Sequence, residues 1–261
     1  MTTSVLPFPV FEAPENWRTV DFISDLHLQE KDPATFDVWQ RYMHSTMADA
    51  VFVLGDLFEV WVGDDAAAQH SFLQQCAAVL KDCAQQRHVA FMRGNRDFLV
   101  GTDFLSACHV HNLQDPTILR FASQAWLLSH GDEGCLDDVD YQAFRRMVRH
   151  PDWQHIFLAK PLAEREEIAR QLRAQSQQHK RNPDAVYADV DPVWATTALT
   201  QSGCSCLLHG HTHRPADHVL PGALNLKRLV LSDWDVQNAK PRAEVLRWHA
   251  AGQVERIKLL T

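Results

Sequence analysis

The segment CLLHGHTHRPAD, residues 206–217, places three histidines directly after a short apolar run. His209, His211 and His213 alternate along the chain, and alternate residues of an extended segment point the same way. Their imidazoles can therefore converge on one point, as a metal ion requires. A solvated polar turn would explain an isolated H-x-H pattern, because the chain holds 15 histidines. The remaining sequence has to distinguish the two interpretations.

Four other strand-length apolar runs also stop at polar clusters. They are rich in Val, Ile, Phe and Leu, as buried strands are, and lie in RTVDFISDLHL (18–28), DAVFVLGDLFE (49–59), HVAFMRGNRD (88–97) and QAWLLSHGDE (124–133). Between the second and third runs, apolar residues recur at helical spacing over residues 72–86, so strand, helix and strand predict an α/β sheet. Ligands of such sheets bind outside the carboxyl ends of the strands. The five clusters are therefore expected to form one site, which argues against the polar turn.

Length and composition indicate one ordinary globular domain. The chain has 261 residues, 46% of them hydrophobic and 22% charged, and a net charge of -8 that gives no support to nucleic-acid binding. We expect a cytoplasmic protein, since neither a signal peptide nor a long apolar segment is visible. Its six cysteines form no C-x-x-C pair and are expected to be reduced core residues. Residues 7–14, PFPVFEAP, suggest an irregular N-terminal extension.

The polar clusters offer carboxylate, amide and imidazole ligands without a thiolate. The candidates are Asp25, His27, Asp56, Asn95, His130, His211 and His213. This set suits Mn or Fe, with Zn possible, and exceeds what one tetrahedral ion can use. Two metal ions bridged by a carboxylate, for which Asp56 is the natural candidate, act on phosphate esters. Walker A, dinucleotide-binding and G-x-S-x-G motifs are absent from the sequence.

The blocks DLHL, GDLFE, GNRD, HGD and GHTHRP resemble the signature of the calcineurin-like metallophosphoesterases, and they spread from Asp25 to Pro215. The longer strings GDLFEVWVGDD, GNRDFLVG, DDVDYQAFRRMVR and LLHGHTHRP are similar to one branch, the UDP-2,3-diacylglucosamine pyrophosphatases of lipid A biosynthesis. The resemblance implies a β-sandwich flanked by helices. It also implies hydrolysis of UDP-2,3-diacylglucosamine to UMP and 2,3-diacylglucosamine 1-phosphate (lipid X), with water attacking the alpha phosphorus, at two divalent ions, of which Mn²⁺ is the usual one.

The resemblance also implies roles for individual residues. One metal ion would be held by Asp25, His27, Asp56 and His213, and the other by Asp56, Asn95, His130 and His211. The implied catalytic residues are Asp56, Asn95, Arg96 and His130, and the implied substrate contacts are Asn95, Arg96, Asp138, Tyr141, Ser176, Lys180 and His211. Beyond Ser176 the match weakens, since Lys180 and Pro183 fall where better-known members carry Asn and Lys. We interpret His209 as a packing residue, and Asp97 and Asp132 as residues that orient their neighbours.

The chain is expected to be one domain, residues 1–261, with a helical lid insertion at about 136–195. Apolar residues at helical spacing and an excess of basic residues over 141–181 suit an anionic lipid at a membrane surface. Trp153 and Phe157 are candidate acyl-chain contacts. A solvated helical hairpin packed on its own apolar seam would have the same composition. The implied partners are the acylated UDP-sugar and, through peripheral binding, the cytoplasmic surface of the inner membrane, with no obligate protein partner.

Two other functions fit part of the pattern. A different phosphodiesterase of the superfamily, acting on nucleotide diesters, would use the same metal ligands but would need no lipid-binding lid. A non-catalytic protein-binding scaffold of the same fold should have lost metal ligands, whereas all seven candidate positions are filled here. The filled positions favour an enzyme over a scaffold.

Overall fold

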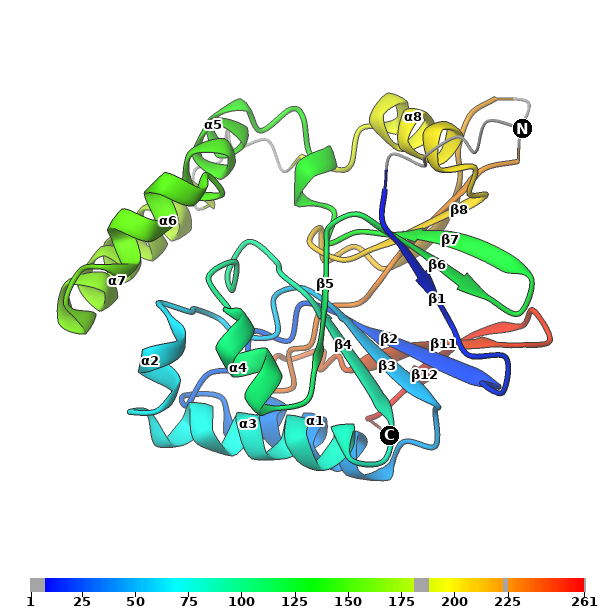
Figure 1. The fold of residues 1–261 in the computed structure, drawn as a ribbon. Helices are drawn as coiled ribbons and strands as arrows, with labels where there is room; N and C mark the ends of the chain where they lie inside the picture. The colour runs from blue at the N-terminus through cyan, green and yellow to red at the C-terminus, as the bar shows by residue number, and fades with distance from the viewer. Residues whose placement is uncertain (1–7, 181–187, 223–224, 261) are drawn as a thin grey trace.

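The computed structural model describes residues 8–180, 188–222 and 225–260, and of residues 175–180 it describes the backbone alone. Its strands form two six-stranded sheets that pack face to face, with helices on the outer faces (Figure 1). The sequence pattern of strand, helix and strand predicts an α/β sheet, and the family resemblance implies a β-sandwich. The structure confirms the β-sandwich flanked by helices.

One sheet has a parallel centre. Its strand order is β12-β11-β2-β3-β4-β5, in which β2 to β5 run parallel and β11 and β12 are antiparallel additions. The strands are β2 (Thr19–Ile23), β3 (Ala50–Leu54), β4 (His88–Met92), β5 (His111–Leu113), β11 (Glu244–His249) and β12 (Val254–Lys258). Strand β3 is buried along its whole length, which explains its uninterrupted apolar sequence.

The other sheet is mixed, with the order β1-β6-β7-β8-β10-β9. Its strands are β1 (Val10–Glu12), β6 (Thr117–Phe121), β7 (Gln124–Leu128), β8 (Cys206–His209), β9 (Ala216–Val219) and β10 (Lys227–Val230). The expectation of an irregular N-terminal extension is wrong for residues 10–12, which form an edge strand parallel to β6. A three-residue strand is too short for alternation to be read from sequence, and its pairing partner lies more than 100 residues away.

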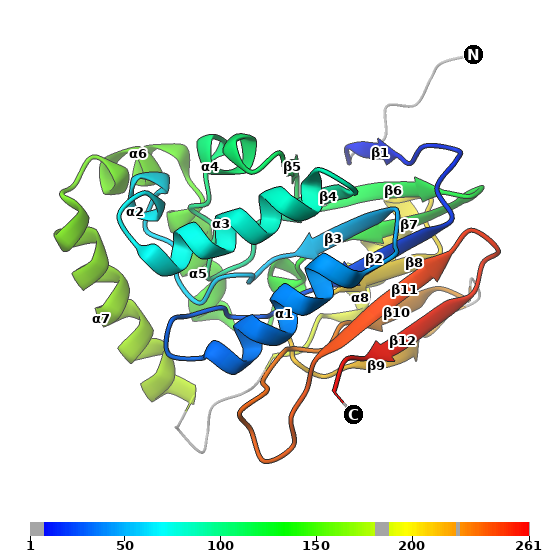
Figure 2. The ribbon, with the colours of Figure 1, turned by 90° about the horizontal axis from the view of Figure 1, so that it is seen from below.

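Helices cover both outer faces of the sandwich. They are α1 (Pro33–Ser45), α2 (Asp64–Ala67), α3 (Ser71–Ala84), α4 (Thr102–Ala107), α5 (Val139–Val148), α6 (Pro151–Leu158), α7 (Leu162–Lys180) and α8 (Pro192–Ser202). Figure 2 shows α1 and α3 lying along the sheet that contains β2 to β4, while α5, α6 and α7 gather at one end of the molecule. Helix α3 confirms the prediction over residues 72–86, and its buried residues, which include Cys76 and Leu80, face the core.

Three apolar clusters hold these layers together. The cluster between the sheets includes Phe22, Phe52 and Trp126, and Trp126 stacks on Trp248 with ring centroids 3.9 Å apart. A second cluster joins the parallel sheet to α1 and α3, and a third packs α8 on the mixed sheet. All six cysteines are buried and unpaired, as expected.

The described part of the region between β7 and β8 is helical, as its spacing predicts, but the two candidate acyl-chain contacts Trp153 and Phe157 are packed within the protein. Phe157 is buried in the cluster that joins the parallel sheet to its helices, and Trp153 stacks on it with ring centroids 4.9 Å apart. Trp153 also contacts Phe98 from the β4–α4 connection. These two residues therefore dock the insertion on the sandwich, and a polar substitution there would disturb folding rather than report a lipid contact. Across the described residues, every helix is too short or too polar to cross a bilayer.

A partly buried histidine at the start of β4 predicts a pH-dependent stability. The His88 ring lies among Phe11, Trp17 and His111, and its Nε2 has no hydrogen-bond partner. Burial, together with the nearby His111, lowers the pKa of His88 to about 4. Because the folded pKa lies below the unfolded value, protonation favours unfolding, and stability is lost as the pH falls from about 6.5 toward 4.

We therefore expect His88→Phe to lose less stability than the wild type between pH 7 and pH 5. The difference should be about 1 kcal/mol, because solvent screening at this partly exposed ring reduces the full linkage energy. Urea unfolding at both pH values measures it. His155→Gln, at an exposed position on α6, should keep the wild-type dependence. Parallel curves for His88→Phe and the wild type would contradict the prediction.

Candidate metal centre

The five polar clusters meet at one place, but they come from both sheets. Asp25 and His27 follow β2, Asp56 follows β3 and Asn95 follows β4 in the parallel sheet; His130 follows β7, and His211 and His213 follow β8 in the mixed sheet. The site therefore lies where the carboxyl ends of strands from the two sheets come together, rather than at the edge of one sheet.

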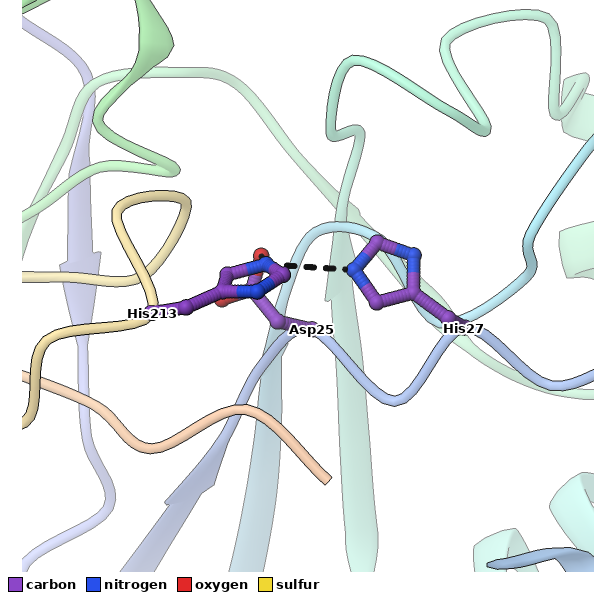
Figure 3. A group of neighbouring side chains, drawn as sticks. All are labelled: Asp25, His27 and His213. Carbon is purple, nitrogen blue, oxygen red and sulfur yellow. Dashed lines mark hydrogen bonds and ion pairs between the residues drawn. The ribbon is translucent and has the colours of Figure 1, made fainter. Parts of the chain in front are cut away.

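Two imidazoles and a carboxylate form the first donor set (Figure 3). The Nε2 atoms of His27 and His213 are 3.2 Å apart, and His213 Nε2 lies 3.3 Å from Asp25 Oδ1. Asp56 Oδ2 is 3.9 Å from His27 Nε2. Four donor atoms thus face one small volume, and they are those that the family resemblance assigns to one metal ion.

An amide oxygen organises the second donor set. Asn95 Oδ1 lies 2.9 Å from His130 Nε2 and 2.8 Å from His211 Nδ1. His130 Nε2 is 3.7 Å from Asp56 Oδ1. The two oxygens of Asp56 therefore face different donor sets, which is the position that a bridging carboxylate needs.

The unsatisfied atoms of the site fit a divalent metal ion. Asp25 Oδ1 is buried and accepts no well-aligned hydrogen bond, since its neighbour His213 Nε2 is 3.3 Å away; Oδ2 accepts one from Ser24 Oγ at 2.6 Å and one from the His211 amide at 2.8 Å. A buried carboxylate oxygen without a well-aligned hydrogen bond is costly unless a cation meets it. The donor set contains only nitrogen and oxygen, as hard to borderline metals prefer.

The ionisable side chains of the site shift one another's pKa. Burial alone would raise the pKa of Asp25, but His213, His130 and His27 outweigh it and hold that pKa well below its usual range. Burial alone would lower the pKa of His130, but Asp56, Asp25 and Asp132 raise it to about 9. Burial and the positive His130 lower the pKa of His211 to about 3. A protonated His130 cannot bind a metal, so loading the site should release its proton.

Five of the seven donor residues have left-handed backbone conformations. They are Asp25 (φ 56°), His27 (φ 50°), Asp56 (φ 52°), His211 (φ 66°) and His213 (φ 53°). This region costs a residue with a side chain about 1–3 kcal/mol and persists only where the surroundings impose it. Concentration of such residues in one cluster is typical of a functional site, and local sequence does not reveal it.

Asp97 holds two of the metal-binding loops in place. Its Oδ1 accepts hydrogen bonds from the amides of Gly94 at 2.8 Å and Asp56 at 3.3 Å, and its Oδ2 accepts from Leu57 at 2.8 Å and Phe58 at 3.3 Å. Burial, and then the nearby Asp56, raise the pKa of Asp97 to about 7. This geometry agrees with the predicted orienting role.

Gly94 sits where no side chain fits. A Cβ on Gly94 would collide with the Asp56 carboxylate and its backbone amide. The G of the GNRD block is therefore required by the close approach of the β3 and β4 loops. The same loops place the Arg96 amide 2.8 Å from Asp56 Oδ1, to which it donates.

Helix α5 contacts the site through Asp132. Tyr141 Oη donates to Asp132 Oδ2 at 2.5 Å, and Arg145 Nε donates to the same oxygen at 2.9 Å. The Tyr141 ring stacks on His211 with centroids 5.9 Å apart. Asp138 caps α5 by accepting from the Tyr141 amide at 3.0 Å. Ser176 and Lys180 lie on α7, but their side chains fall outside the described residues.

Most basic side chains of the insertion are paired with carboxylates. The pairs are Arg145 and Arg149 with Asp132, Lys160 with Glu164, Arg165 with Asp65, Arg170 with Glu167, and Arg173 with Glu59. Asp132, Asp65 and Glu59 lie outside helices α5 to α7, so four of these six ion pairs attach the insertion to the sandwich. The excess positive charge read from the sequence is therefore largely neutralised in the fold.

A pocket of about 330 Å³ opens over the donor sets. Its lining includes five donor residues together with Arg96 and Glu59, while Asp25 and His130 are fully buried. His209 is also buried; its Nδ1 lies 2.8 Å from the Gly210 carbonyl oxygen, and burial lowers its pKa to about 4. It packs against Gly131, as a packing residue should.

Sequence reasoning missed two carboxylates beside the donor histidines. Glu59 Oε2 lies 3.0 Å from His27 Nδ1, and Asp233 Oδ2 lies 3.6 Å from His213 Nδ1. Glu59 belongs to the GDLFE block, so its position in that block was an available signal. Asp233 follows β10 in a segment that carries no recognisable motif, and only folding brings it to His213.

Comparisons with known proteins agree with this geometry. The profile of the calcineurin-like phosphoesterase family matches residues 18–215. A protein of Aromatoleum aromaticum named UDP-2,3-diacylglucosamine hydrolase is 40% identical over 235 residues, which cover 88% of this chain and 93% of that protein. A protein of the same name from Chromobacterium violaceum is 43% identical over 223 residues, covering 82% of this chain and 90% of that protein. The chain belongs to the calcineurin-like phosphoesterase family and is a metallophosphoesterase, a hydrolase.

Proposed function

We propose that this phosphoesterase hydrolyses the pyrophosphate bond of UDP-2,3-diacylglucosamine to UMP and 2,3-diacylglucosamine 1-phosphate. The observation that carries the proposal is the 37–43% identity, over most of the chain, to proteins named UDP-2,3-diacylglucosamine hydrolase. The position of Asp56 between two donor sets supports it, because such a pair of sites suits hydrolysis of a phosphate anhydride.

The donor residues would hold two divalent ions, for which we propose Mn²⁺. Asp25, His27, Asp56 and His213 would form one site, and Asp56, Asn95, His130 and His211 the other. When bound, the ions supply an activated water and positive charge for the phosphate oxygens. Arg96 lines the pocket beside them, and its planar guanidinium suits a phosphate group.

The remaining substrate contacts are proposed from the resemblance and from position. Tyr141, in the first turn of α5, stacks on His211, and we assign it and the capping residue Asp138 to the glucosamine; Ser176 and Lys180 on α7 complete the proposed set. Asp138 already caps α5, so its side chain would keep one carboxylate oxygen for that bond.

We also propose that residues 1–261 form one domain in which residues 136–195 are a lid that binds the acyl chains at the cytoplasmic surface of the inner membrane. Exposed apolar side chains on α5 and α6 support this role: Val139, Met147 and Ile156 are 69%, 51% and 64% exposed. Charge adds little support, because the described basic residues are mostly paired within the protein.

Reaction in ¹⁸O-labelled water tests the proposed reaction. With Mn²⁺ present, UDP-2,3-diacylglucosamine should be cleaved and UMP should carry the label, because attack is proposed at the alpha phosphorus. Mass spectrometry of both products measures this, and a chelated sample and a simple diester serve as controls. Label in the lipid phosphate alone would contradict the proposed orientation. Cleavage of the simple diester without cleavage of the lipid would favour a different phosphodiesterase.

A further inference from the structure

The imidazole of His27 has a partner on each side. Its Nε2 faces the first donor set, 3.2 Å from His213 Nε2. Its Nδ1 lies 3.0 Å from Glu59 Oε2, although the carboxylate sits off the straight line from a ring N–H. A carboxylate on the far nitrogen of a metal-binding histidine sets the tautomer and the ring orientation. Glu59 therefore lies where it can decide which nitrogen of His27 is offered to a metal ion.

Glu59 is itself held on two sides. Its backbone amide donates to the Leu28 carbonyl at 3.2 Å, next to His27 in the chain. Its other carboxylate oxygen, Oε1, lies 2.9 Å from Nη2 of Arg173, and its side chain is only 11% exposed. Arg173 comes from α7, more than 100 residues further along the chain. Histidine, glutamate and arginine thus form a row from the metal centre to the insertion.

The second histidine of the same donor set has a similar arrangement built without the insertion. His213 Nδ1 lies 3.6 Å from Asp233 Oδ2, and Arg242 donates to both oxygens of Asp233 at 2.9 and 2.7 Å. Asp233 and Arg242 both belong to the C-terminal part of the sandwich. The recurrence of a histidine, a carboxylate and an arginine at both imidazoles indicates that the arrangement serves the site and is more than a surface ion pair.

Helix α7 has other anchors that do not involve Glu59. Arg165 pairs with Asp65 and donates to the Val62 carbonyl, and Ile168 packs against the main apolar cluster. The Arg173 contact is therefore not needed to keep α7 in place. It is the contact that joins α7 to a metal-binding histidine.

We propose that Glu59 is a positioning residue that orients His27 for metal binding, and that Arg173 of the insertion holds Glu59 in that position. The first donor set then reaches its full affinity only when α7 is docked. This inference rests on the proposed metal centre, and it extends that centre to two residues outside the proposed ligand sets.

Mn²⁺ binding to the metal-stripped full-length protein tests the proposal by isothermal titration calorimetry. Glu59→Ala should raise the Mn²⁺ dissociation constant of one of the two sites, the one formed by the first donor set, by about 10–100-fold. This is the usual effect of removing a carboxylate behind a metal-binding histidine. Arg173→Ala should weaken the same site by several-fold to about tenfold, and Arg173→Lys should recover part of the loss. In the double variant Glu59→Ala/Arg173→Ala the loss should equal that of Glu59→Ala alone, because the two residues act in series.

Arg170→Ala is the matched control, since Arg170 lies on the same helix, is 71% exposed and pairs only with Glu167 among the described contacts. It should bind Mn²⁺ as the wild type does. Melting temperatures identify any misfolded variant, and Arg173→Ala tests the proposal even where Glu59→Ala does not fold. If the single variants Arg173→Ala and Glu59→Ala both fold and both bind Mn²⁺ with wild-type affinity, the proposal is overturned.

The substrate proposal fails separately. One outcome is that the wild type fails to cleave UDP-2,3-diacylglucosamine while these variants still lose Mn²⁺ affinity. That result would reject only the proposed substrate and would leave the positioning role of Glu59 and Arg173 in place. A small chromogenic diester gives a second readout, because it needs the metal centre without the acyl-chain contacts. Its hydrolysis at limiting Mn²⁺ should fall in Arg173→Ala and recover at saturating Mn²⁺. A loss that saturating Mn²⁺ does not reverse would contradict a role through metal affinity.

Discussion

Asp56→Ala is expected to reduce hydrolysis by at least about a thousandfold, a loss of about 4 kcal/mol of transition-state stabilisation. The two oxygens of Asp56 face separate donor sets, at 3.9 Å from His27 Nε2 and 3.7 Å from His130 Nε2. The substitution therefore removes a ligand from both proposed metal sites. It also removes the acceptor of the Arg96 amide, so the loop that carries Arg96 loses one of its contacts with the β3 loop.

Metal content and kcat/KM measured on the same preparation check this prediction. Inductively coupled plasma mass spectrometry after gel filtration should find fewer than the wild-type number of Mn²⁺ ions in Asp56→Ala. Asp103→Ala removes a carboxylate from an exposed position on α4 and should retain both metal ions and activity. A folded Asp56→Ala protein with wild-type metal content and activity would refute the two-metal centre.

Asp97→Ala is expected to destabilise the fold by about 3–5 kcal/mol. Four buried or partly buried backbone amides would lose their acceptor, and each unsatisfied buried donor costs about 1–3 kcal/mol before the loops relax. Because those amides belong to the loops that carry Asp56 and Asn95, Mn²⁺ affinity should fall as well.

Urea unfolding of the metal-stripped and Mn²⁺-loaded protein separates the two effects of Asp97→Ala. The apo protein should show the loss of stability, and the loaded protein should show in addition a smaller gain from Mn²⁺ than the wild type shows. Asp82→Ala on α3, where the carboxylate is 61% exposed, controls for the change of charge. Stability within about 1 kcal/mol of the wild type would show that the loops do not depend on this carboxylate.

The local features of the chain were readable from its sequence. The apolar runs that became β2, β3, β4, β7 and β8 are short, and each ends in residues that can serve as ligands. Helix α3 follows from its spacing of buried residues. The spacing of apolar residues and the residues that follow a strand are local in the sequence, so both can be recognised without knowledge of the fold. The same features predict the seven metal ligands, and the structure brings all seven side chains together.

Tertiary structure alone decided which strands share a sheet and which charges meet. The two sheets, the edge strand β1, and the burial of Phe157 all depend on contacts between segments far apart in the chain. The same is true of the pairs that neutralise the insertion and of Glu59 and Asp233 beside the donor histidines. The sequence does not show whether a carboxylate faces water or an imidazole. Its role depends on burial and on partners that only the folded chain supplies.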